Sequence, residues 1–342
     1  MGDLLVPNFN VKSFYGNYTV NFQEYIDYKN LGTHFIVDQS VCDLYKLDYL
    51  PNLIKIKAIE ESKSFSNIEK VLNVLLELNL KKNSILVAIG GGIIQDITSF
   101  IGSIWMRGIT WVYVPTTLLS QADSCIGSKS SINLNNIKNV IGTFFAPKFI
   151  YICKYFLNTL SEKDIKSGIG EILKLKIIQD EEINYEDIQN NLQKYIHEAL
   201  LIKKQYIEID EHDLGIRQLL NYGHCFGHAI ESACNFSIPH GVAISMGMDI
   251  ANFMSFKSNT LSYDKYKKIH KILFQNYENF KDIKIDKNIL IDSVMNDKKN
   301  TLEFLNLIYL TDTKVEKIKI KNNHDTCIKI LESFMQLNLK IE

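Results

Sequence analysis

Apolar and polar positions follow different patterns in the two parts of the chain. In the first part, short runs rich in β-branched and aromatic residues recur, as expected of buried strands. Four such runs are predicted strands: residues 33–38, 84–89, 110–115 and 148–153. Residues 68–80 instead carry apolar side chains at helical spacing. Strands that alternate with helices predict a mostly parallel sheet of the α/β class.

From about residue 157 onward, long helical patterns dominate. Four of the five prolines lie in the first 150 residues, so little interrupts helices in the second half. A chain of 342 residues is also long for a single core. We therefore predict an α/β domain over residues 1–155 and a mainly α-helical domain over residues 156–342. A cleft between them is the expected location of an active site.

Composition limits the class of partner. The formal net charge is −1, so no basic field predicts binding to nucleic acid or to an anionic membrane surface. No apolar run reaches the length of a membrane span, and the N-terminus lacks the pattern of a signal peptide. The six cysteines form no C-x-x-C pair, which favours a reducing compartment. We expect a cytoplasmic enzyme that acts on a small molecule.

Three glycines, Gly90 to Gly92, follow a predicted strand and begin a predicted helix. Glycines let the backbone approach a phosphate closely, and a helix N-terminus favours an anion. The run lacks G-x-G-x-x-G spacing, so a tight turn stands beside a dinucleotide site as an alternative. Asp96, in the first turn of that helix, is either a cap-region charge or a partner for cofactor or substrate.

Polar residues follow the third predicted strand. Thr116 and Thr117 lie at a strand's carboxyl end, where α/β proteins bind ligands. A lone loop lysine is more often solvated than functional, but four residues together favour anion binding: Arg107, Lys129, Lys138 and Asn139. Glu171 and Lys174 are expected near the start of a helix, where the flanking Gly168 and Gly170 suggest that something packs closely.

The densest polar stretch lies between residues 217 and 240. His224 and His228 are four residues apart, so on a helix both imidazoles project from one face. Arg217 and Asn221 precede them at a similar spacing, and His240 follows. Two histidines at this spacing also occur on ordinary helix faces, so the pattern alone leaves open both a metal site and a structural face.

Taken together, these blocks resemble the 3-dehydroquinate synthases and the wider sugar phosphate cyclase superfamily over about residues 38–299. The strongest blocks are Gly90-Gly-Gly-Ile-Ile-Gln-Asp96, Trp105-Met-Arg-Gly108, Pro115-Thr-Thr-Leu-Leu119, residues 123–139, Gly170-Glu-Ile-Leu-Lys174, residues 217–228 and His240-Gly241. The resemblance implies an N-terminal NAD-binding domain and a C-terminal helical domain that binds a divalent metal. The metal would be zinc, with cobalt as an alternative, and the protein would be a homodimer.

The resemblance also assigns site residues by position. Metal ligands would be Glu171, His224 and His240, which leave coordination open as catalytic zinc requires. NAD contacts would be Asp38, Glu60, Lys63, Gly91, Gly92, Asp96, Thr116, Thr117, Lys138, Phe156, Thr159 and Leu160. Substrate contacts would be Arg107 (from the dimer partner), Asp123, Lys129, Asn139, Lys174, Lys203, Arg217, Asn221, His228 and Lys298, with Lys299 as its alternative. Catalytic roles would fall to His228, as a proton shuttle, and to Asp213, Lys174, Arg217 and Asn221.

The reaction implied by the resemblance belongs to the shikimate route to aromatic amino acids. A sugar-acid phosphate, 3-deoxy-D-arabino-heptulosonate 7-phosphate, is oxidised by NAD and then loses phosphate by β-elimination. The hydride returns, the ring opens, and an intramolecular aldol step closes the carbocycle of 3-dehydroquinate.

Some positions depart from the family pattern and keep alternatives open. The loop Gly127-Ser-Lys-Ser130 stands where the family usually has Gly-Gly-Lys-Thr, Asp213 replaces a glutamate, and Ser40 and Ser167 replace asparagines. A paralogous cyclase that forms amino-dehydroquinate or a C7 cyclitol is therefore an alternative. Arg217 and Asn221 argue the other way, because cyclases of neutral sugar phosphates have no substrate carboxylate to pair with a buried guanidinium. Further alternatives are a metal-dependent polyol dehydrogenase and a non-catalytic NAD-binding module.

Overall fold

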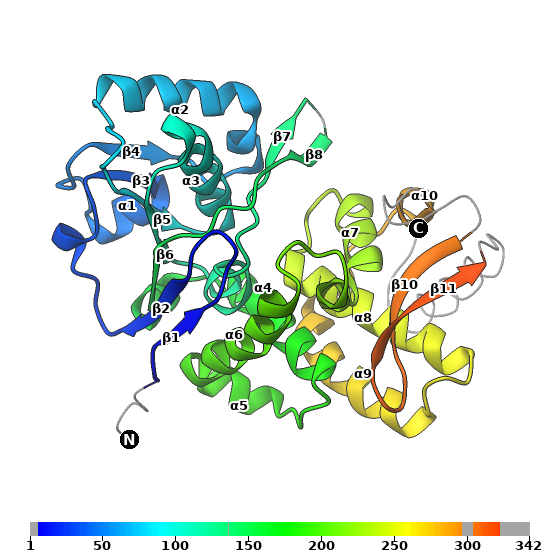
Figure 1. Cartoon of the computed structure of the whole chain (residues 1–342). Helices are drawn as coiled ribbons and strands as arrows, with labels where there is room; N and C mark the ends of the chain where they lie inside the picture. Colours follow the sequence, from blue (N-terminus) through cyan, green and yellow to red (C-terminus); the bar gives the residue numbers. More distant parts are fainter. Residues whose placement is uncertain (1–5, 136, 296–303, 322–342) are drawn as a thin grey trace. The chain divides into compact units, whose positions relative to one another are not determined.

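The computed structural model describes residues 6–135, 137–295 and 304–321 (Figure 1). The chain forms two compact units, residues 1–160 with 196–213, and residues 161–195 with 214–342. The sequence division at residue 155 differs in that residues 196–213 belong to the first unit. Lys203 explains this return, because its Nζ lies 3.0 Å from Asp123 Oδ1 of that unit. The helical pattern of the sequence is uninterrupted here, so it does not show that the chain passes from one unit to the other within this helix.

The first unit is built on a seven-stranded sheet with the order β1-β2-β9-β6-β5-β3-β4. The strands are β1 (Phe9–Val11), β2 (Tyr18–Gln23), β3 (His34–Asp38), β4 (Leu53–Ile56), β5 (Leu86–Gly90), β6 (Trp111–Pro115) and β9 (Phe149–Cys153). Within this sheet, β1 and β2 are the one antiparallel pair of described strands, which confirms the predicted mostly parallel sheet. The four predicted strands are β3, β5, β6 and β9, whereas the apolar pattern did not predict β1, β2 and β4.

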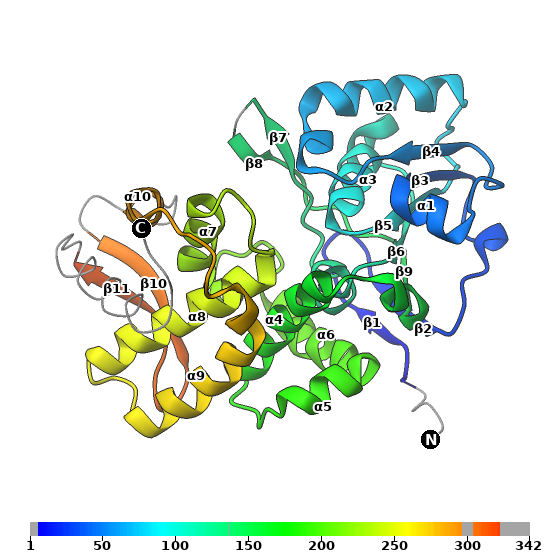
Figure 2. The ribbon, with the colours of Figure 1, turned by 180° about the vertical axis from the view of Figure 1, so that it is seen from behind.

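Helices cover this sheet, as its fully buried central strands β5 and β6 require. The helices are α1 (Gln39–Tyr45), α2 (Phe65–Glu77) and α3 (Gly92–Ile104), with short turns η1 (Tyr28–Asn30), η2 (Glu60–Lys63), η3 (Trp105–Arg107), η4 (Ser120–Ser124) and η5 (Lys154–Thr159). The α3 helix packs on β3, β5 and β6. A hairpin of β7 (Ile132–Leu134) and β8 (Ile137–Ile141) extends away from the sheet in both views (Figures 1 and 2).

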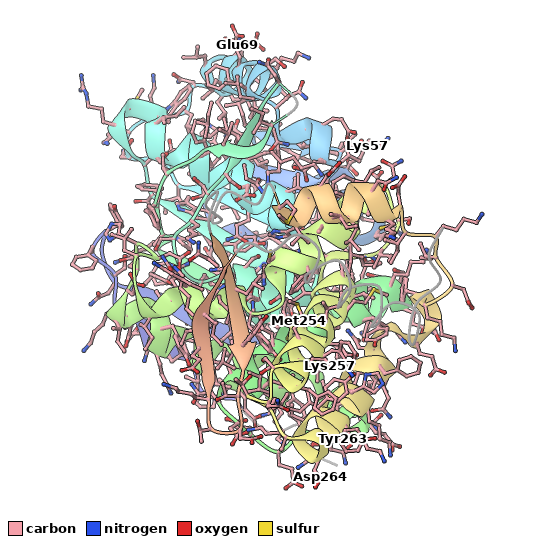
Figure 3. All side chains as sticks on the ribbon, turned by 90° about the vertical axis from the view of Figure 1, so that its right-hand side faces the viewer. Lys57, Glu69, Met254, Lys257, Tyr263 and Asp264 are labelled. Atoms are coloured by element: carbon pink, nitrogen blue, oxygen red, sulfur yellow. The ribbon has the colours of Figure 1, made fainter. Side chains whose placement is uncertain are left out.

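The second unit is mainly helical, as predicted. Its elements are α4 (Glu162–Ile178), α5 (Tyr185–Asn190), the start of α6 (Leu192–Ile209), η6 (Ile216–Asn221), α7 (His224–Ala233), α8 (His240–Lys257), α9 (Tyr263–Tyr277), η7 (Glu278–Phe280), α10 (Lys287–Met295), β10 (Phe304–Leu310) and β11 (Val315–Lys321). The central α8 packs against α4, α7 and α9 and is buried from Gly241 to Ser255. The start of α9 is at the surface, where Tyr263 is exposed (Figure 3).

The crossing of α4 and α8 brings two backbones into contact. A Cβ atom on Gly170 would lie 1.9 Å from the carbonyl oxygen of Gly241, and one on Gly241 would lie 1.8 Å from that of Ser167. Glycine at both positions therefore permits the crossing, which confirms the expected close packing near Gly170. Because Glu171 follows Gly170 and His240 precedes Gly241, the same contact brings two proposed metal ligands together.

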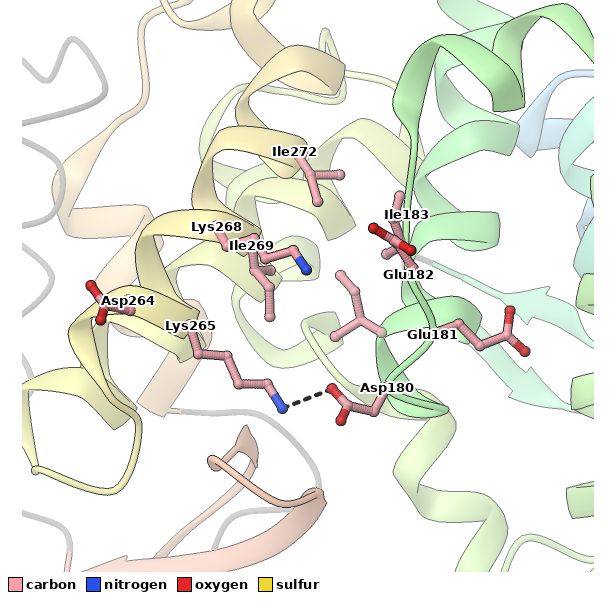
Figure 4. Close-up of a pocket in the computed structure, with 10 residues that line it drawn as sticks. Asp180, Glu181, Glu182, Ile183, Asp264, Lys265, Lys268, Ile269 and Ile272 are labelled. Atoms are coloured by element: carbon pink, nitrogen blue, oxygen red, sulfur yellow. Dashed lines mark hydrogen bonds and ion pairs between the residues drawn. The ribbon is translucent and has the colours of Figure 1, made fainter.

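Two further features of the described residues bear on function. No helix among them is both long and apolar enough to span a membrane. A pocket of about 600 Å³ opens on the second unit between the end of α4 and α9 (Figure 4). Lys265 Nζ lies 2.8 Å from Asp180 Oδ1 across this pocket. The residues that line it include none of the predicted site residues.

A buried carboxylate in the middle of α8 anchors this helix to α9. Asp249 Oδ2 accepts hydrogen bonds from His270 Nδ1 at 2.6 Å and from Tyr277 Oη at 2.5 Å. Burial raises the pKa of Asp249, and the hydrogen bond to Asp249 raises the pKa of His270 above 6.5. A group with a raised folded-state pKa contributes stability that is complete below its unfolded pKa and is lost as pH rises through the folded value.

The Tm advantage of the wild-type protein over the His270→Gln variant is therefore expected to be largest at a pH below 6.5. It should shrink as pH rises above that value and through the pKa of folded His270, because the unfolded imidazole then loses the proton that the folded one still holds. Thermal unfolding of both proteins across this range measures the difference. A gap that is constant or widens with pH would show that the Asp249–His270 contact has no linked proton.

Candidate active site

Glu171, His224 and His240 come together within the second unit. His240 Nε2 lies 3.3 Å and His224 Nε2 3.7 Å from Glu171 Oε1, and the Glu171 side chain is buried. The two histidines are the first residues of α8 and α7. Glu171 lies in the middle of α4, not near a helix start as expected, because the helix begins at Glu162. Crossing helices, and not one local motif, assemble this cluster.

The buried carboxylate of Glu171 attracts positively charged groups. Burial opposes ionisation of Glu171, yet the charge of Lys174 and the contact with His240 together lower the pKa of Glu171 below its usual range. Lys174 forms a buried ion pair with Glu171. Burial would lower the pKa of His240, but hydrogen bonds to Glu171 and Glu231 raise it to about 10. A carboxylate with two imidazoles in such a place fits a divalent cation, which takes the place of the bound proton.

His228 lies next to the same cluster. α7 places it on the face that carries His224, as the four-residue spacing predicted, with ring centroids 5.3 Å apart. One nitrogen each of His224, His228 and His240 lies within 4.8 Å of the others. The geometry therefore permits two ligand sets for a metal ion: the three histidines, or Glu171 with His224 and His240. His228 is exposed whereas Glu171 is buried, which suits His228 for exchange with substrate or solvent.

Glu231 is a residue that sequence reasoning missed. Both of its carboxylate oxygens lie 3.3 Å from His240 Nδ1, and its side chain is mostly buried. It follows His228 by three residues and His224 by seven, so it lies on the same face of α7. That spacing was visible in the sequence and could have identified it.

Two other predicted residues of the second unit lie on η6, which packs against α4. Arg217 is buried there, and Asn221 Nδ2 donates to the carbonyl oxygen of Gln218 at 3.1 Å. Lys298 and Lys299 fall outside the described residues. The structure therefore places the predicted carboxylate-binding arginine in a protected position.

In the first unit, a polar network surrounds the buried Lys63. Its Nζ lies 2.6 Å from Asp96 Oδ2 and donates to Asn139 Oδ1 at 2.8 Å. Asp96 also accepts from Ser131 N and Oγ, both at 3.1 Å. Glu60 is 3.9 Å from Lys63 Nζ. Asn139, assigned to substrate by resemblance, thus joins residues that the resemblance assigned to NAD.

The start of α3 leaves room for a ligand. A Cβ atom on Gly92 would have only Ser124 Oγ near it, at 4.0 Å, whereas one on Gly91 would lie 3.0 Å from Thr117 Cγ2. Because β5 ends at Gly90 and α3 begins at Gly92, this open space lies at a helix N-terminus, where a diphosphate binds well. The predicted strand–glycine–helix arrangement is confirmed.

The remaining residues proposed for NAD binding also lie in the first unit. Asp38 caps α1 by accepting from Ser40 N at 2.9 Å, and burial raises the pKa of Asp38. Thr159 Oγ1 is 2.8 Å from Tyr45 Oη. The others are Thr116 and Phe156, which are buried, the exposed Lys138 on β8, and Leu160, which follows η5.

The structure gives different polar partners to members of the predicted anion cluster of Arg107, Lys129, Lys138 and Asn139. Lys129 Nζ lies 2.6 Å from Asp213 Oδ2, whereas Asn139 binds Lys63. The β7–β8 hairpin carries Asn139 close to η2, and Ser131 Oγ, two residues after Lys129, also donates to Asn139 Oδ1 at 2.8 Å. Arg107 is exposed on η3 with a positive φ of 63°.

Family models match most of the chain. Residues 53–167 match the 3-dehydroquinate synthase N-terminal model, and residues 168–300 match the 3-dehydroquinate synthase C-terminal model. The 3-dehydroquinate synthase of Clostridium tetani is 35% identical over 329 residues, which is 91% of this chain and 88% of that protein.

Solved structures share the fold. A 2-deoxy-scyllo-inosose synthase complexed with carbaglucose-6-phosphate, NAD+ and Co2+ has a TM-score of 0.84 at 21% identity, covering 97% of this chain and 100% of that one. A 2-epi-5-epi-valiolone synthase from Streptomyces hygroscopicus with NAD+ and Zn2+ bound has a TM-score of 0.80 at 18% identity, covering 94% and 97%. At sequence identities this low, the similarity shows a shared fold and nothing about activity.

Proposed function

Because the chain belongs to the 3-dehydroquinate synthase family, we propose that it converts 3-deoxy-D-arabino-heptulosonate 7-phosphate to 3-dehydroquinate and phosphate. The observation that carries this proposal is the convergence of Glu171, His224 and His240 beside the buried Lys174. The enzyme is a phosphate-eliminating lyase. The proposed localisation of the enzyme is cytoplasmic.

NAD and a divalent metal ion are the proposed cofactors, with zinc as the metal and cobalt as its alternative. NAD would accept and return one hydride, while the metal would polarise substrate oxygens. Glu171, His224 and His240 would hold the metal. The glycine turn at Gly91 and Gly92 would hold the NAD diphosphate, for which the open start of α3 is support.

The protein side chains would bind the substrate and move protons. His228 would transfer the proton between the ring carbon and the leaving phosphate, since imidazole ordinarily titrates near neutral pH. Lys129 and Lys203 would bind phosphate oxygens, and Asp213 would act as an acid or base beside Lys129. Arg217 would pair with the substrate carboxylate.

The proposed assembly is a homodimer. In it, the exposed Arg107 on η3 would reach the substrate bound to the other protomer. Exposed apolar side chains next to it, Ile104 and Met106, support an interface at this turn.

Phosphate release measured together with NADH absorbance tests the proposed function. With metal and NAD bound, each heptulosonate phosphate should yield one phosphate and no net NADH, and a chelator should stop turnover. A polyol dehydrogenase would accumulate NADH in step with product. Turnover of sedoheptulose 7-phosphate without any of the heptulosonate would select the paralogous cyclase, and no phosphate from the heptulosonate would refute the proposal.

The contact of Glu231 with His240 Nδ1 gives a further expected result. A carboxylate behind a ligating imidazole fixes its tautomer, and its loss typically weakens metal binding about 10- to 100-fold. Glu231→Gln is expected to weaken metal affinity by this factor in a chelator competition assay. The control is Glu278→Gln, which alters an exposed glutamate of the same unit. Equal affinities in the two variants would remove Glu231 from the metal site.

A further inference from the structure

Three segments that are distant in sequence meet at the carboxylate of Glu211. Glu211 is 2% exposed, and it accepts from Ser13 Oγ at 2.7 Å and from Phe14 N at 2.8 Å. The third donor is Ser128 Oγ. These donors come from the turn between β1 and β2 and from the loop before β7, while Glu211 itself follows α6. Through these hydrogen bonds, the Glu211 side chain connects all three segments.

Ser128 occupies a backbone conformation that disfavours a side chain. Its φ is 65°, in the left-handed region, where residues other than glycine are strained. It is also one of the positions where this chain departs from the family pattern. The hydrogen bond from its hydroxyl to Glu211 offsets that strain and gives the serine a reason to be there.

A second connection joins the same two segments next to the first. Lys129 follows Ser128, and Asp213 lies two residues after Glu211. Lys129 Nζ is 2.6 Å from Asp213 Oδ2, with the lysine side chain 48% exposed and the aspartate 18% exposed. The Ser128–Glu211 hydrogen bond is thus an inner connection closed to solvent, and the Lys129–Asp213 ion pair is an outer one that a ligand can reach.

Aromatic contacts fix the residue between Glu211 and Asp213. The His212 ring lies 5.6 Å from Phe14, 5.9 Å from Tyr15 and 5.0 Å from Phe144, between ring centroids. Tyr15 Oη is 3.1 Å from His212 Nε2. The β1–β2 turn therefore holds this segment both through its carboxylate and through its histidine.

We propose that Glu211 is a positioning residue that sets the distance between Lys129 and Asp213 through Ser128. This inference rests on the proposed function, which gives Lys129 its phosphate and Asp213 its proton-transfer role. A direct catalytic role does not suit Glu211, because its oxygens are occupied by donors and closed to solvent. Reacting groups displaced by about 1 Å can lose on the order of 100-fold in rate.

Steady-state kinetics of Ser128→Ala, Glu211→Gln and the double variant test this. Each single variant should lower kcat about 10- to 100-fold, with metal and NAD contents unchanged. The double variant should be no slower than the slower single variant, because both substitutions act on the same Ser128–Glu211 hydrogen bond. Ser99→Ala is the control, since it loses a partly buried hydrogen bond to the Phe145 carbonyl and should lower Tm but not kcat.

Acetylation of Lys129 by acetic anhydride, followed by mass spectrometry, gives a readout without turnover. Lys129 should react several-fold faster in Ser128→Ala and Glu211→Gln than in the wild type or in Ser99→Ala. An inactive wild type would refute the proposed function alone, and this labelling would still decide the role of Glu211. Wild-type kcat in both single variants, multiplicative losses in the double variant, or equal labelling in all proteins would each overturn the proposal.

Discussion

The His240→Ala variant is expected to lose bound metal and 3-dehydroquinate formation together. The substitution removes one of three proposed ligands and, among the residues that the structure describes, leaves the buried Glu171 with Lys174 and His224 as cationic or imidazole partners. Loss of a residue that hydrogen-bonds to a metal ligand already weakens metal affinity about 10- to 100-fold. Loss of a ligand itself should therefore weaken metal affinity at least about 100-fold. Elemental analysis after gel filtration, together with a phosphate-release assay, measures both effects.

The matched control is His228→Ala, which removes the neighbouring imidazole. This variant should keep its metal but lose about 10²- to 10⁴-fold in kcat, the usual contribution of general acid–base catalysis. The pair separates the two ligand sets that the geometry permits. Metal lost from His228→Ala and retained by His240→Ala would assign the metal to a set without His240 and refute our assignment.

Gly170→Ala is expected to lower the stability of the protein and its metal affinity together. The new methyl group would lie 1.9 Å from the Gly241 carbonyl oxygen, so α4 and α8 must separate. Alanine favours a helix over glycine by about 1 kcal/mol, but overpacking against backbone should cost about 3 kcal/mol. Because Glu171 and His240 flank this contact, metal affinity should fall together with the free energy of unfolding.

Gly102→Ala in α3 is the control for the gain in helix propensity. Its Cβ would meet nothing closer than Phe145 Cε1 at 3.4 Å, so its Tm should equal or exceed that of the wild type. Calorimetric unfolding and chelator competition on both variants measure the two effects. A Gly170→Ala protein with wild-type Tm and metal affinity would show that the α4–α8 crossing does not determine the metal site.

The sequence predicted the elements whose side chains repeat regularly. The predicted strands at residues 33–38 and 84–89 became β3 and β5, and the spacing of His224 and His228 predicted one face of α7. It did not predict the short strand β1 or the β10–β11 hairpin. Such elements depend on pairing with distant partners, which a local pattern does not contain.

The limits at the site have the same cause. Nothing local marks residues 196–213 as part of the first unit, because the signal is long-range packing such as the Lys203–Asp123 pair. The anion cluster stays a prediction, and its local pattern did not show that a hairpin brings Asn139 to Lys63. Glu231 was different, because the sequence shows its helical spacing from His228. The sequence did not show that Glu231 contacts His240.

Metal titration of the metal-free protein, followed by the rate of 3-dehydroquinate formation, tests the central claim most directly. The claim is that one ion held by Glu171, His224 and His240 is required for turnover. We predict that, with NAD present, the rate rises linearly from zero with added zinc and reaches its plateau at one ion per chain. Full turnover of 3-deoxy-D-arabino-heptulosonate 7-phosphate by the metal-free protein, or a plateau at two ions per chain, would contradict the claim.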